Sequence, residues 1–65
     1  MGSIQTDRYV YIVECKLDKT ADEALQQIED NNYAAPFVAD SRHLYKIGVN
    51  FSSATRGVEN YRIEE

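Results

Sequence analysis

A glutamate and a lysine, Glu14 and Lys16, end the otherwise apolar and β-branched run Tyr9–Leu17. Side chains two positions apart lie on the same face of a β-strand, about 7 Å from each other at ~3.3 Å per residue. A carboxylate and an ammonium group at that separation can converge on one metal ion or one phosphate. The alternative is an ordinary ion pair at a sheet edge, which is the usual origin of a Glu-x-Lys triplet. Their place at the carboxyl end of an apolar strand favours a site.

A helix follows this strand. Thr20-Ala21-Asp22-Glu23 is a capping box, in which the threonine hydroxyl and the glutamate carboxylate satisfy exposed backbone amides. The helix is expected over residues 21–31, because asparagine at 31 and 32 tolerates the left-handed conformation that ends many helices. Open α/β sheets bind ligands at the carboxyl ends of their strands, where such a helix begins.

The helix presents one apolar stripe, made of Ala21, Ala24, Leu25 and Ile28. At 100° per residue, Gln27 lies at the margin of this stripe and Gln26 points away from it. If the helix packs on the sheet, Gln27 can look toward Glu14 and Lys16; the alternative is a solvated glutamine. Tyr33 follows the helix, where a tyrosine usually packs with its hydroxyl in water.

Two further strands are expected. In residues 44–51, aromatic and β-branched side chains occupy every second position, which is typical of a strand. Gly48 in this segment would let the helix approach closely. Residues 58–64 are expected to form an edge strand antiparallel to residues 44–51. Pro36 can open a short helical turn before these two strands. With a first strand over about 8–16, the fold class is α/β: a small βαββ unit with a mixed sheet, whose first two strands are parallel.

Composition limits the classes of function. The chain has 65 residues and a net charge of −4, with Lys and Arg scattered along it, which argues against nonspecific nucleic-acid binding. It has no membrane-spanning run and no signal-peptide pattern, so we expect a cytoplasmic protein without membrane contact. The single cysteine, Cys15, is interpreted as a buried hydrophobic residue, and His43 as a surface residue.

Residues 1–3 look like the remnant of an expression tag, and residues 4–65 then form one partial domain. The sequence enters its first strand almost at once. This indicates an excerpt from a longer protein.

From Tyr9 to Arg62 the chain resembles the C-terminal PD-(D/E)xK nuclease-like domain of bacterial AAA-ATPase-like proteins, which has a restriction-endonuclease-like fold. The resemblance rests on Val13-Glu14-Cys15-Lys16-Leu17-Asp18-Lys19, Ala24-Leu25-Gln26-Gln27-Ile28, Tyr33-Ala34 and Ile47-Gly48-Val49-Asn50-Phe51. It implies a metal-dependent DNA endonuclease, with the ATPase domain of a parent protein as a partner.

The resemblance also implies roles for individual residues. Glu14 and the backbone carbonyl of Cys15 would be ligands of Mg²⁺ or Mn²⁺. Lys16 would stabilise charge on the scissile phosphate or help to activate water. Gln27 and Tyr33 would correspond to a glutamine and a tyrosine that position substrate or metal.

The sequence departs from the family pattern in lacking an Asp on an earlier strand and a Glu on an earlier helix. Asp7 is too close to Glu14 in sequence to replace that Asp. We therefore expect the isolated chain to be inactive. We also expect the first strand to present an unpaired edge, which would make the chain a homo-oligomer.

The sequence and the resemblance lead to three hypotheses about function. The first is a partial nuclease domain that needs its missing acidic ligands. The second is a non-catalytic module for self-association or for docking to an ATPase. The third is a component of an anti-phage system or mobile element, which genome context would decide.

Overall fold

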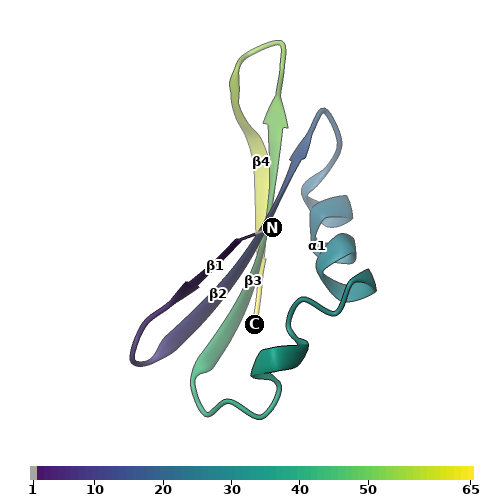
Figure 1. Cartoon of the computed structure of the whole chain (residues 1–65). Coiled ribbons are helices and arrows are strands. Elements are labelled where there is room, and N and C mark those ends of the chain that lie inside the picture. Colours follow the sequence, from purple (N-terminus) through teal and green to yellow (C-terminus); the bar gives the residue numbers. More distant parts are fainter. Residues whose placement is uncertain (1) are drawn as a thin grey trace.

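The computed structural model describes residues 2–65 and shows a four-stranded sheet with one helix on one of its faces (Figure 1). The elements are β1 (Gly2–Gln5), β2 (Tyr9–Leu17), α1 (Ala21–Asp30), the 3₁₀ turn η1 (Ala35–Phe37), β3 (His43–Ser52) and β4 (Gly57–Glu64). The strand order is β1-β2-β3-β4. β2 and β3 are parallel, whereas β1 and β4 run antiparallel to their neighbours.

The predicted mixed α/β architecture is confirmed, with one addition. β1 precedes the three predicted strands, so the order is ββαββ and not βαββ. β1 pairs Gly2 with Val13 and Gln5 with Val10, which corrects the expectation that the first predicted strand has an open edge. Within residues 2–65, β1 pairs with Val10–Val13, and the remainder of β2 from Glu14 to Leu17 has no strand along this edge. Whether residues 1–3 derive from a tag stays a prediction.

A tight turn joins β1 to β2. The Thr6 amide donates to the Tyr9 carbonyl at 2.8 Å, and the Thr6 hydroxyl accepts from the amides of Arg8 and Tyr9 at 3.3 and 3.0 Å. Threonine hydroxyls form such local bonds in turns. Asp7 lies inside this turn, at the end of β2 that is opposite to Glu14.

α1 covers one face of the sheet and forms the core with it. The predicted capping box is present, with the Glu23 amide donating to the Thr20 hydroxyl at 3.0 Å. Buried side chains of β2 and α1 make up the core, with further apolar residues packed around them: Val10, Ile12, Leu25 and Ile28, then Tyr33, Ala34, Phe37 and Leu44. No helix of residues 2–65 is long and apolar enough to cross a membrane.

Gly48 sets how close α1 lies to the sheet. A Cβ atom at this position would lie 2.4 Å from the carbonyl oxygen of Ala21 and 3.0 Å from Cγ of Leu25. The first of these distances is a clash with backbone, so only glycine fits beneath the first turns of α1. This confirms the close approach predicted from the sequence.

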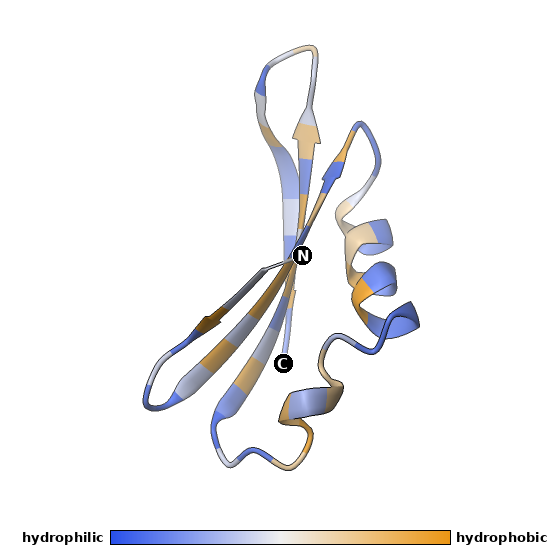
Figure 2. Cartoon of the chain, in the orientation of Figure 1, coloured by the Kyte–Doolittle hydropathy of each residue, from blue (hydrophilic) through white to orange (hydrophobic). Residues whose placement is uncertain are grey.

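The opposite face of the sheet has no helix over it (Figure 1), and hydrophobic residues recur along the strands (Figure 2). Cys15 lies on this face and is exposed, so the interpretation of Cys15 as a buried residue is wrong. The reason is that the side chains of β2 that pack under α1 are Val10, Ile12 and Glu14, and Cys15 alternates away from them. His43, as predicted, is exposed.

The Gly48 contact predicts the effect of adding a methyl group. Gly48→Ala should lower the free energy of unfolding by about 1–3 kcal/mol, the usual cost of overpacking a tight contact. Urea denaturation followed by circular dichroism measures this. Gly57→Ala is the matched control, because no atom lies within 4 Å of a Cβ placed at Gly57. Equal stability of the two variants would contradict the account of this contact.

Candidate functional site

The carboxyl end of β2 brings the predicted acid and base to the helix-covered face. Glu14 is 6% exposed and buried with the core, and Lys16 is half-buried two positions further along. Burial alternates along β2 from Tyr9 to Glu14, which places Glu14 on the α1 side together with Val10 and Ile12. The same-face arrangement predicted from the spacing is therefore confirmed.

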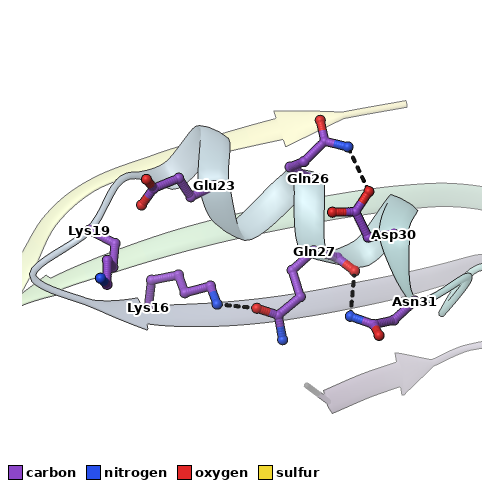
Figure 3. A pocket seen from close by; sticks show the side chains of 7 residues that line it. All are labelled: Lys16, Lys19, Glu23, Gln26, Gln27, Asp30 and Asn31. Atoms are coloured by element: carbon purple, nitrogen blue, oxygen red, sulfur yellow. Dashed lines mark hydrogen bonds between the residues drawn. The ribbon is translucent and has the colours of Figure 1, made fainter.

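Gln27 fixes the lysine. The Nζ atom of Lys16 donates a hydrogen bond to Oε1 of Gln27, which comes from the last turns of α1 (Figure 3). The backbone carbonyl of Gln27 in turn accepts from the Asn31 side chain at 3.1 Å. The helix position predicted to look toward the strand end therefore does so. Gln26, predicted to point away, bonds to Asp30 at 2.9 Å.

A shallow groove of about 460 Å³ runs between the end of β2 and one side of α1. Its lining combines two lysines with carboxylates and amides of the helix: Lys16, Lys19, Glu23, Gln26, Gln27, Asp30 and Asn31 (Figure 3). Glu14 is not one of these lining residues. The strand end therefore has a solvent-facing ammonium group on Lys16 and a buried carboxylate on Glu14.

Two asparagines, the buried Asn50 and the exposed Asn60, hold the loop that leads from Lys16 into α1. Oδ1 of Asn50 accepts from the Lys19 amide at 2.8 Å, and Oδ1 of Asn60 accepts from the Ala21 amide at 3.2 Å. Asn50 is completely buried, and its side-chain amide donates to Glu59 at 3.2 Å. This role of Asn50 was not predicted from the sequence. The available signal was a polar residue on the helix-facing side of β3, in register with Lys16.

Asp18 shapes the start of the same loop. Its φ of 54° lies in the left-handed region, which Asp adopts more readily than most residues. Its carboxylate accepts from the amide and the hydroxyl of Ser53 at 3.0 and 2.5 Å. These bonds to the Ser53 hydroxyl and amide lower the pKa of Asp18 from its ordinary value of 3.8. The turn after Lys16 is thus tied to the end of β3.

Tyr33 is placed differently from the other predicted residues. It is half-buried and packs against the core formed by Val10, Ile12, Leu25 and Ile28. It does not line the groove of Lys16 and Gln27. The structure therefore brings Glu14, Lys16 and Gln27 together at one end of β2, and the role of Tyr33 stays a prediction.

The donor set at the strand end is incomplete for a metal ion. Within residues 2–65, no group of three or more His, Cys, Asp or Glu side chains could hold a metal. Mg²⁺ requires near-octahedral oxygen coordination, and the buried strand end offers the single carboxylate of Glu14. These residues alone do not fit a complete Mg²⁺ or Mn²⁺ site, and the carbonyl of Cys15 as a ligand stays a prediction.

A comparison with protein families matches residues 2–61 to the PD-(D/E)XK nuclease superfamily. The match covers most of the chain, and the chain belongs to this superfamily. Members typically use divalent metals. No curated protein and no solved structure matches the chain.

The Asp18 bonds give a prediction about pH. Because the pKa of Asp18 is lower in the folded chain than its ordinary value of 3.8, this carboxylate stabilises the fold above that value. The contribution is lost as the pH falls through the lowered pKa. Ser53→Ala should raise the pKa of Asp18 toward 3.8, which an NMR titration of the carboxyl carbon measures. Ser41→Ala is the control; an unchanged Asp18 titration in Ser53→Ala would contradict the assignment.

Proposed function

We propose that this chain is part of a metal-dependent DNA endonuclease-like domain and is inactive in phosphodiester hydrolysis on its own. Its superfamily membership supports nuclease-like chemistry. One observation carries the assignment to this site: Gln27 holds Lys16 on the same strand face as the buried Glu14.

Lys16 is the residue suited to the phosphate. Its ammonium group donates to Gln27 through one hydrogen and keeps two further donors for a ligand in the groove. A lysine side chain loses considerable rotamer freedom when it is fixed. Gln27 supplies part of that ordering before substrate binds, which is the preorganisation that electrostatic stabilisation of a transition state needs.

Glu14 is the residue suited to the metal. A carboxylate buried beside Lys16 is a hard oxygen donor of the kind that Mg²⁺ and Mn²⁺ bind. A bound divalent ion would supply Lewis-acid chemistry at the phosphate. The Cys15 carbonyl and Tyr33 belong to this proposal through the family resemblance alone.

The register of β1 indicates where a second acidic ligand belongs. Gly2, the first residue of β1, pairs with Val13, so the strand position across from Glu14 falls outside the described residues. A carboxylate from an upstream continuation of β1 would approach Glu14 from the neighbouring strand. This agrees with the Asp on an earlier strand that the family resemblance implies.

A second function, a non-catalytic interaction module, is favoured by one feature: the uncovered apolar face of the sheet. Large apolar side chains on β1, β2, β3 and β4 are exposed there, and such faces commonly mark protein–protein contacts. Another copy of the chain or the ATPase domain of a parent protein is the partner class that this function would use.

Plasmid nicking tests the proposed function. The isolated chain should show no nicking above buffer with Mg²⁺ or Mn²⁺, because its donor set is incomplete. A longer chain with the upstream sequence of its parent protein should nick DNA. In that chain Glu14→Gln and Lys16→Met should each lower the rate on the order of 100-fold or more, the usual scale for one electrostatic group.

Asp7→Asn is the control for the longer chain, because Asp7 is an exposed carboxylate in the turn at the far end of β2. It should leave the rate unchanged. Robust nicking by the isolated chain that is lost in Glu14→Ala would contradict the proposal of an incomplete site. Nicking by the longer chain that survives Glu14→Gln would contradict the site itself.

A further inference from the structure

The sheet face opposite α1, called here the open face, consists of apolar and aromatic side chains from all four strands. Its members alternate with the residues that α1 covers: Ile4 on β1, then Tyr9, Tyr11, Val13, Cys15 and Leu17 on β2, Tyr45, Ile47, Val49 and Phe51 on β3, and Val58, Tyr61 and Ile63 on β4. The register of the strands places these residues side by side across the sheet. The open face is therefore continuous from one edge to the other.

The open face exposes several large apolar side chains to solvent. Leu17 is 60%, Tyr61 64% and Ile63 56% exposed, and Ile4, Val58 and Phe51 are exposed as well. At roughly 100 Å² for each of these side chains, the face offers roughly 600 Å² of apolar surface, at the upper end of the patches of monomeric proteins. The chain measures 40 × 23 × 15 Å, so this is one of its two broad sides.

The charge pattern of the open face suits a second copy of the chain. None of the described residues inside the strands of this face is Asp, Glu, Lys or Arg, although the whole chain has a net charge of −4. One carboxylate does reach the face from outside the strands: Glu65, just beyond β4, bonds to Tyr45. In a two-fold interface the same patch meets itself, so any charge in its centre would face a like charge. The charged side chains of β3 and β4, such as Lys46 and Arg62, bond instead to α1.

We propose that the open face is a self-association surface, which packs against the open face of a second copy in a two-fold dimer. Two sheets packed face to face lie about 10 Å apart with interdigitating side chains. The two faces would together remove roughly 1,200 Å² from water, which reaches the lower limit of specific interfaces. This surface replaces the β2 edge as the expected contact between copies, because β1 covers part of that edge.

A nucleic-acid strand fits the open face less well. Tyr9, Tyr11 and Tyr45 could offer bases a stacking platform, but their rings already pack against each other at centroid distances of 5.5–6.0 Å, with Tyr11 stacked on both Tyr9 and Tyr45. Single-strand binding also requires cations along the phosphates, and the described strand residues of this face supply no Lys or Arg. The observations therefore favour an apolar partner.

Cys15 is a native reporter of the proposed contact. It is exposed in the single chain and lies beside Val49, near the middle of the open face. A dimer formed through this face shields the thiol from a bulky aromatic disulfide reagent. The rate of its reaction with that reagent should therefore fall as the protein concentration rises.

Sedimentation velocity on the 65-residue chain tests the proposal without any assay of nuclease activity. The chain should dimerise at micromolar concentration. Ile63→Lys places two charges in the dimer interface and should raise the dissociation constant on the order of 100-fold. Val38→Lys is the matched control, because Val38 is an exposed apolar residue of the connection between α1 and β3. It should leave the dissociation constant unchanged.

Circular dichroism of each variant establishes that it is folded, and Tyr61→Glu provides a second disruption of the same face. A folded monomer at every concentration, with Cys15 reacting at one rate throughout, would overturn the proposal. So would a dimer that Ile63→Lys and Tyr61→Glu leave intact. A monomer that binds a single-stranded oligonucleotide and loses that binding in Tyr11→Ala would assign the face to nucleic acid instead.

Discussion

The close packing of α1 on β3 at Gly48 is the constraint on which the site depends. With the Ala21 carbonyl only 2.4 Å from the place where a side chain would begin, α1 lies directly on the sheet. Because α1 lies this close to the sheet, the side chain of Gln27 reaches Lys16. Ala24, Leu25 and Ile28 of α1 also bury the face of β2 that includes Glu14. A helix held further from the sheet would leave the lysine in solvent.

Much of this arrangement can be predicted from the pattern of residue types in the sequence. The capping box fixed the start of α1, and its apolar stripe determined which side of the helix meets the sheet. Once that stripe is buried, the position of Gln27 at its margin follows from the helical period. The pairing of Glu14 with Lys16 on one face follows from the strand period. Local geometry therefore predicted the contact that defines the site.

Other features could not be predicted because non-local contacts decide them. β1 contains Gly, Ser and Gln, which have little strand preference, and it forms because β2 offers a partner edge. Cys15 was expected to be buried because its face of β2 is the more apolar one. However, burial depends on which face the following helix covers, and α1 covers the face with Glu14 and Lys16. Asn50 has its role because it meets the loop after β2 across the sheet.

The central claim is that Gln27 fixes the ammonium group of Lys16 at the end of β2, and NMR of the lysine ammonium protons tests it most directly. In the unmodified chain the Lys16 signal should be resolved from that of Lys19 and exchange more slowly with water, because Oε1 of Gln27 holds it. Gln27→Ala should abolish this difference, and Gln26→Ala, on the adjacent position, should preserve it. A Lys16 signal that exchanges like Lys19 in the unmodified chain, or that is unaffected by Gln27→Ala, would contradict the account.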